Sequence, residues 1–169
     1  MGDSYAEVII KKRISMMATF FRVFIVVATV IMTYVSIIQL QMYAVIIIAL
    51  FIFLTYVVYK NTDLEYEYFF INGQLDVECI YGKKKRKPAK SFNFDKLEVM
   101  GPITHQKILA YEHRTDLKEF NYTSGYPGRN VYVAILVGQS GKLGRLYFEP
   151  SEKMVQTIYA HTPSRVFMQ

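Results

Sequence analysis

Five consecutive basic side chains form the most evident candidate contact site in this sequence. They lie in the stretch YGKKKRKPAK, residues 81–90, and comprise Lys83, Lys84, Lys85, Arg86 and Lys87. Runs of this kind serve in nucleic-acid binding, in nuclear import and in contacts with anionic lipid headgroups. The elements that surround the run decide which of these functions is open to it.

The remaining reactive side chains do not gather into a predicted site. Cys79 is the single cysteine and alternates with Leu75 and Val77, which predicts a small buried side chain rather than a nucleophile. Glu65 and Glu67 share one strand face, where solvation is the ordinary expectation. Three histidines fall on different predicted elements, away from other metal-ligating residues: His105, His113 and His161. We therefore expect no catalytic residue, no metal and no cofactor, and we do not expect an enzyme.

A long uncharged segment predicts two membrane-spanning helices. No residue from Val23 to Tyr59 is charged, and a single helix of this length would measure about 55 Å, well beyond the ~30 Å hydrocarbon core of a bilayer. Polar residues cluster only at 39–41, so we predict a first span over 23–38 and a second over 42–59. A buried helical hairpin in a soluble protein is the weaker alternative, because neither segment offers a wide polar face.

The distribution of basic residues predicts the orientation of this hairpin. Lys11, Lys12, Arg13 and Arg22 precede the first span, Lys60 closes the second, and the turn between the spans carries no charge. Basic flanks stay in the cytoplasm, so both termini are predicted to be cytoplasmic in a multi-pass protein of the cytoplasmic membrane. Arg22 is expected to anchor the first span by extending toward the inner headgroups.

The segment before the first span is predicted to be an interfacial helix. Ser4 and Glu7 have the spacing of a capping box, and apolar residues 8, 9, 16 and 17 alternate with the basic cluster. Apolar and basic faces would separate along such a helix, so we expect it to lie on the inner leaflet.

Three hydroxyl side chains share one face of the first predicted span. They are Thr29, Thr33 and Ser36, at spacings of four and three residues. Small hydroxyl residues suit close packing against the second span or against another copy of the chain. Hydroxyls that hydrogen-bond to their own helix one turn back are an equally good explanation, and both interpretations stay open.

After the second span the hydrophobic pattern changes to the period of two that strands show. Residues 64–71 and 75–81 alternate around Asn72-Gly73, a strong signal for a two-residue hairpin turn. Further strands are predicted over residues 91–94, 108–113, 119–122, 131–137 and 143–148. Ser151 is predicted to cap a final helix. Seven short strands and one terminal helix predict a small open barrel with the helix over one mouth.

A resemblance to a known family runs through most of the chain. The stretch EYEYFFINGQLDVECIYGKKKRKPAKSFNFDKLEVM, residues 65–100, resembles the opening of the bacterial pleckstrin-homology-like domains. With the hairpin before it and the ending FEPSEKMVQTIYAHTPSRVF, residues 148–167, the chain resembles a family of small membrane proteins of Gram-positive anaerobes.

This resemblance implies a fold and carries no activity with it. The expected fold class is an α+β membrane protein, in which an N-terminal transmembrane helical hairpin precedes a small pleckstrin-homology-like antiparallel β-barrel with a C-terminal capping helix. The expected domains are residues 1–60, which hold the interfacial helix and the hairpin, and residues 61–169, which form the cytoplasmic β domain with its C-terminal helix.

The predicted membrane hairpin restricts the function of the basic run. Nuclear import and duplex DNA are poor fits, since the run is close to a membrane span and the net charge of the chain is only +6. Three roles stay open: a topology signal at a solvated hairpin tip, contact with anionic headgroups, and contact with an acidic protein partner.

The expected function is that of a non-enzymatic, membrane-tethered interaction module at the inner face of the cytoplasmic membrane. Its expected partners are the lipid bilayer, anionic headgroups and an unidentified membrane or cytoplasmic protein, and nucleic acid is not expected. The alternative is a subunit of a homo-oligomeric membrane assembly or transporter complex, with the helix contact at the hydroxyl face.

Overall fold

The computed structural model describes residues 5–39, 41–138 and 141–168. Contacts divide the chain into two compact units, which are described separately below. The helical unit comprises residues 13–39, 41–64 and 81–85. The sheet unit comprises residues 5–12, 65–80, 86–138 and 141–168. Segments before and after the helices therefore contribute to the same sheet unit.

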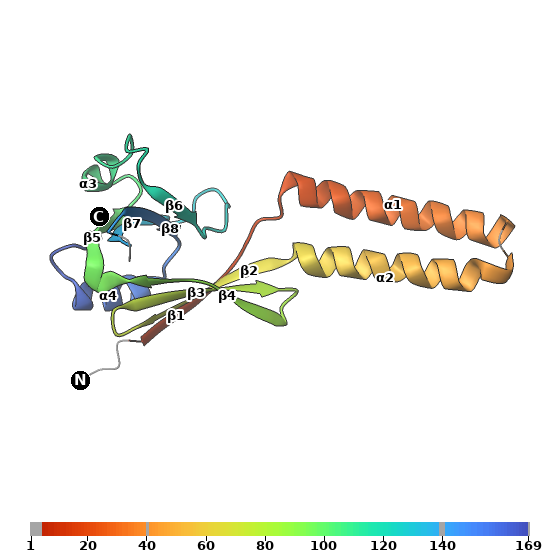
Figure 1. The fold of residues 1–169 in the computed structure, drawn as a ribbon, viewed down its shortest axis with the longest axis horizontal. Helices are drawn as coiled ribbons and strands as arrows, with labels where there is room; N and C mark the ends of the chain where they lie inside the picture. The colour runs from red at the N-terminus through yellow and green to blue at the C-terminus, as the bar shows by residue number, and fades with distance from the viewer. Residues whose placement is uncertain (1–4, 40, 139–140, 169) are drawn as a thin grey trace. The chain divides into compact units, whose positions relative to one another are not determined.

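The helical unit is a pair of long apolar helices. Helix α1 (Met16–Gln39) and helix α2 (Ala44–Thr62) are joined through the 3₁₀ turn η1 (Gln41–Tyr43) and lie side by side (Figure 1). Their mean hydropathies are 2.2 and 2.5, which makes both long and apolar enough to cross a membrane. The first predicted span, 23–38, lies within α1, which begins earlier, at Met16; the second, 42–59, begins in η1 and continues through most of α2. The Ser15 hydroxyl accepts a hydrogen bond from the backbone N–H of Ala18 at 3.1 Å and so caps that end.

Hydroxyl groups contact each other where the two helices pack. Thr29 Oγ1 lies 2.9 Å from Thr55 Oγ1 on the opposite helix, and each hydroxyl also lies within hydrogen-bond distance of a carbonyl one turn back in its own helix. Both explanations of the hydroxyl face therefore apply to Thr29. Ser36 is fully buried and Thr33 is half-buried on the same helix.

The sheet unit contains two four-stranded sheets. The first has the strand order β1-β2-β3-β4. Its strands are β1 (Tyr5–Lys11), β2 (Leu64–Ile71), β3 (Gln74–Tyr81) and β4 (Lys85–Asn93). The second has the order β5-β7-β8-β6. Its strands are β5 (Leu97–Pro102), β6 (Lys118–Asn121), β7 (Tyr132–Val137) and β8 (Leu143–Phe148). The two sheets do not close into a barrel, so the prediction of a barrel is wrong in that respect.

The N-terminal segment is a strand, and the prediction of an interfacial helix there is wrong. Strand β1 runs antiparallel to β2, with Ala6 opposite Phe70 and Lys11 opposite Glu65. Ala6 is buried while its neighbours Tyr5 and Glu7 are exposed, as expected for a strand with one face on the core. Pairing with β2 overrides the local capping-box signal, and the predicted cap Ser4 lies outside the described residues.

The predicted hairpin turn between β2 and β3 is confirmed. Asn72 and Gly73 both have positive φ angles, 47° and 81°, which the two central residues of a type I′ turn require. A Cβ on Gly73 would lie 2.8 Å from Asp95 Oδ1 and would also collide with the His161 ring. Glycine is therefore needed at this position for two reasons, backbone conformation and space.

The core lies between the two sheets and is rich in aromatic rings. Tyr68 and Phe70 of β2 point inward and make edge-to-face contacts with Phe148 and Phe94, at centroid distances of 6.0 and 5.6 Å. The 3₁₀ turn η2 (Phe94–Lys96) connects β4 to β5 across this core. The Tyr68 hydroxyl donates to the Tyr122 carbonyl at 2.6 Å, and burial raises the pKa of Tyr68 far above its ordinary value.

Helix α4 (Glu152–His161) ends the fold as predicted. The Ser151 hydroxyl accepts a hydrogen bond from the backbone N–H of Met154 at 3.2 Å, which confirms it as the N-cap. Met154 and Ile158 are fully buried, and the helix contacts β1. The apolar stripe of α4 therefore covers part of the core.

One predicted strand is a helix instead. Residues 108–113 were expected to form a strand, but α3 (Gln106–Leu109) and the turn after it occupy this stretch. His105 caps α3, because its Nδ1 accepts a hydrogen bond from the backbone N–H of Lys107 at 3.2 Å. Ile108 is buried within a helical turn, where a single apolar position does not require the alternation of a strand.

Candidate functional site

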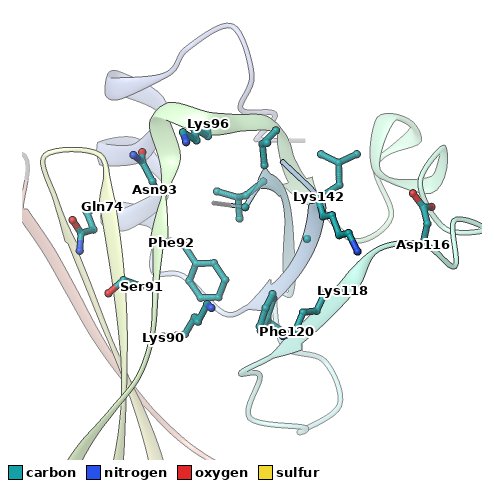
Figure 2. Close-up of a pocket in the computed structure, with 15 residues that line it drawn as sticks. Gln74, Lys90, Ser91, Phe92, Asn93, Lys96, Asp116, Lys118, Phe120 and Lys142 are labelled. Carbon is teal, nitrogen blue, oxygen red and sulfur yellow. The ribbon is translucent and has the colours of Figure 1, made fainter. Parts of the chain in front are cut away.

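The sheet unit has an opening between β4 and β6, with a volume of about 650 Å³ (Figure 2). That volume lies within the range of sites that bind small molecules or short segments of a protein. The opening is lined by strands of both sheets and by the turns that precede β5 and β8. Its lining therefore includes residues from both sheets rather than from one sheet alone.

The two strands that border the opening carry the same local pattern, a lysine followed two residues later by a phenylalanine. Strand β4 contributes Lys90 and Phe92, and β6 contributes Lys118 and Phe120. The two phenylalanine rings meet at a centroid distance of 5.3 Å. Both lysine ammonium groups lie near the Phe120 ring, at 5.3 and 5.4 Å from its centroid. Glu119 lies between Lys118 and Phe120 in β6 and forms an ion pair with Arg145, whose Nη1 lies 2.8 Å from Glu119 Oε1.

The lining of the opening carries a strong excess of positive charge. Lys90, Lys96, Lys118 and Lys142 are exposed lining residues, and none of them forms an ion pair with another described residue. Asp116 is the single acidic residue of this lining, and the Arg114 guanidinium holds it at 2.6 and 3.0 Å. That contact lowers the pKa of Asp116 and neutralises its charge locally. Such a lining attracts anions.

Both strands beside the opening are the last strands of their sheets. Strand β4 ends one sheet and β6 ends the other. A terminal strand leaves one row of backbone N–H and C=O groups unused by its sheet. The site therefore offers backbone hydrogen-bonding groups as well as lysine ammonium groups.

The predicted basic run lies partly in a turn and partly in β4. Lys83 and Lys84 lie in the turn after β3, where Lys83 has a φ angle of 58°, and Lys85 begins β4. All five basic side chains of the run are exposed, as expected for a charged hairpin. Within the run, Arg86 Nη2 lies 3.2 Å from Glu67 Oε1. The run is therefore not a uniform patch of solvated charge.

Glu67 is fully buried, which contradicts the expectation that it is solvated. Its side chain has 0% exposure, and neither carboxylate oxygen has a hydrogen-bond partner among the described residues, although Arg86 is at ion-pair distance. Burial raises the pKa of Glu67, Arg86 opposes this shift, and the charges of Glu7 and Glu78 add to it. No sequence signal could place Glu7 beside Glu67 without knowledge of the pairing between β1 and β2.

The other reactive residues are held in structural roles at separate places. Cys79 is half-buried, and burial raises the pKa of its thiol. His105 caps α3, whereas His161 at the end of α4 lies 2.8 Å from Asp95 Oδ1. The described residues contain no group of three or more side chains able to hold a metal ion.

The sheet unit thus combines two four-stranded sheets with a C-terminal helix against the core. The family model described as "Bacterial PH-like domain (DUF6106)" matches residues 2–168, so the chain belongs to this family. No curated protein and no solved structure was found to match the chain.

Proposed function

We propose that the protein is a membrane-anchored, non-enzymatic interaction module of the cytoplasmic membrane. In this proposal α1 and α2 cross the bilayer, both termini are cytoplasmic, and the pleckstrin-homology-like unit binds a partner at the inner face. The observation that carries the proposal is the combination of two membrane-length apolar helices with a domain of a family suited to interaction.

The contacts of Arg22 support insertion of the helices. Its guanidinium donates to Thr62 Oγ1 at 2.7 Å and lies 4.8 Å from the centroid of the Tyr59 ring. Lys60 lies over the ring of Tyr56 at 5.7 Å. Basic and aromatic side chains thus gather at the ends of the helices that the chain enters and leaves, as they do at membrane interfaces.

The distribution of charge supports the cytoplasmic location of both termini. The turn Gln41–Tyr43 between the helices has no charged residue, whereas Arg22, Lys60 and the basic run are close to the opposite ends of the helices in sequence. Basic residues stay on the cytoplasmic side during insertion. The basic run has two further roles under this proposal, contact with anionic headgroups and contact with an acidic protein.

The alternative function, a subunit of a homo-oligomeric assembly, receives less support from the helix contacts. The hydroxyl of Thr29 already contacts Thr55 of the same chain, and Ser36 is buried within the same chain. Packing of Thr29 and Ser36 within the helix pair of one chain does not require a second copy.

Cysteine labelling tests the proposed topology. In a chain with Cys79→Ala, a Gln41→Cys substitution should react with a membrane-impermeant maleimide added to intact cells. A Lys153→Cys substitution in α4 should react only after permeabilisation. Labelling of position 153 but not 41 in intact cells would reverse the orientation, and release of the protein by alkaline carbonate would exclude insertion.

A further inference from the structure

We propose that the opening between β4 and β6 binds an acidic segment of a partner protein in an extended conformation. This inference rests on the proposed function as an interaction module and specifies where the module binds and what chemistry it recognises. The ligand class follows from three features of the opening. These are its positive charge, the unpaired edges of the terminal strands β4 and β6, and the aromatic floor, a name used here for the rings of Phe92 and Phe120.

The charge of the opening selects an anionic ligand. Four lysines line it, and the one carboxylate among the lining residues is already bound by Arg114. The lysines come from four separate parts of the chain. Lys90 lies in β4, Lys96 in η2 and Lys118 in β6, and Lys142 immediately precedes β8. Figure 2 shows them at separate positions around the opening rather than converging on one point. A ligand with several spaced negative charges fits this arrangement better than a single phosphate group does.

The strand edges select an extended backbone. Because β4 and β6 are terminal strands, each presents unused backbone groups to a strand that adds beside it. Pro88 removes one donor from β4, so the useful part of that edge is the stretch after it, which includes Lys90 and Phe92. Lysines on both edges repel the same edges of another copy, and this favours a segment of opposite charge over self-association.

The aromatic floor selects the residues between the acidic ones. Phe92 is buried and Phe120 half-buried, and their rings meet beneath the lysines of the two strands. Gly144 leaves room for this floor, because a Cβ there would lie 3.3 Å from the Phe120 ring. Side chains of an extended segment that face the opening can therefore place carboxylates on the lysines and an apolar group on the rings.

Fluorescence anisotropy on the full-length protein in detergent micelles tests this proposal. The probe is a fluorescein-labelled octapeptide of alternating Glu and Val. Its controls are the same peptide with Lys in place of Glu, and the Glu peptide with methyl groups on alternate backbone nitrogens. The Glu peptide should bind, binding should weaken as salt is raised, and both control peptides should bind at least about tenfold more weakly.

Substitution of the lysines identifies the site. Each change to Gln should weaken binding about threefold, the size expected for an exposed charge pair. The combined variant should therefore lose roughly 80-fold if the effects add. The four changes are Lys90→Gln, Lys96→Gln, Lys118→Gln and Lys142→Gln. The control, Arg129→Gln with Lys153→Gln, changes exposed basic side chains outside both the opening and the basic run and should bind like the parent.

Several outcomes would overturn the proposal. These are absence of binding at millimolar peptide, equal binding by the four-lysine variant when its circular dichroism matches the parent, and equal binding of the N-methylated peptide. Competition by vesicles of anionic lipid, with no effect from unlabelled Glu peptide, would reassign the opening to headgroups. Membrane extraction and cysteine labelling test the proposed function separately, so a failure here leaves that function unchanged.

Discussion

Replacing Arg86 by Gln removes a guanidinium that lies 3.2 Å from the buried carboxylate of Glu67. The Arg86 side chain is 58% exposed, whereas that of Glu67 is 0% exposed, so the change leaves a desolvated carboxylate without its counter-charge. Breaking a fully buried ion pair costs about 3–5 kcal/mol. Because water partly screens Arg86, we expect a smaller loss in the free energy of unfolding, about 1–2 kcal/mol at pH 7.

The loss should depend on pH in a defined direction. Burial raises the pKa of Glu67 above its ordinary value of 4.5, so the folded protein binds this proton more readily than the unfolded chain. The free energy of unfolding therefore falls as pH rises from the unfolded pKa through the folded pKa. Removal of Arg86, which lowers the pKa of Glu67, should make that fall larger and extend it to higher pH. Near pH 3 the carboxyl is protonated in both states and the variant should match the parent.

Cys79 provides the assay for this prediction. The single thiol lies half-buried in β3, and burial raises its pKa, so folding protects it from a thiol reagent. Pulse labelling of Cys79 across a urea series gives the unfolding midpoint of the sheet unit in the full-length protein. Lys84→Gln is the matched control, with an expected change within about 0.5 kcal/mol. Arg86→Gln combined with Glu67→Gln should recover most of the loss, because no buried charge is left unpaired.

An Arg86→Gln midpoint equal to that of Lys84→Gln at pH 7 would refute this reasoning. A loss of the same size at pH 3 and pH 7 would also refute it, because it would then arise from packing and not from the charge of Glu67. Failure of Glu67→Gln to restore stability in the double variant would lead to the same conclusion.

Three further predictions concern the turn after β2, the buried carboxylate of Glu149 and the basic run. Gly73→Val should lower the free energy of unfolding by at least about 1 kcal/mol, since it forces a β-branched residue to a positive φ and against Asp95, and a parental urea midpoint would contradict this. Glu149→Ala should cost about 1–3 kcal/mol, because the Ser124 backbone N–H and hydroxyl both bond to that carboxylate at 2.7 and 2.8 Å; Glu152→Ala is the exposed control. A chain in which a short glycine-serine turn replaces residues 14–62 should sediment with anionic vesicles but not neutral ones, and less so at high salt; the change of four lysines to Gln should abolish this if the basic run contacts lipid, and equal sedimentation would exclude that contact. The four are Lys83, Lys84, Lys85 and Lys87.

The elements that could be predicted from sequence are those whose signals are local. The uncharged stretch before Lys60 specifies two apolar helices by composition alone, and Asn72-Gly73 specifies a turn by backbone conformation. Ser151 caps α4 through a hydrogen bond within three residues. In each case the residues that cause the local structure lie within a few positions of the residue from which it was predicted.

The features that could not be predicted depend on partners distant in sequence. Strand β1 forms because β2 pairs with it, with Lys11 opposite Glu65. The sequence of Tyr5–Lys11 alone does not indicate that β2 is its partner. The burial of Glu67 follows from the same pairing. The lysine-lined opening was missed for a related reason, because Lys90 and Lys118 come together only when two sheets end beside each other. The basic run could be recognised because its five residues are consecutive, whereas the lysines that line the opening are far apart in the sequence.

The insertion of the helices between two paired strands has a consequence for biogenesis. Strand β1 is synthesised before α1, but its partner β2 follows α2. The first sheet can therefore be completed only after both helices have left the ribosome. Under the proposed topology, a chain in which only one helix had inserted would leave β1 and β2 on opposite sides of the membrane, where they cannot pair. Completion of the sheet thus requires insertion of both helices, and a misinserted chain would leave the β2 edge without its partner strand.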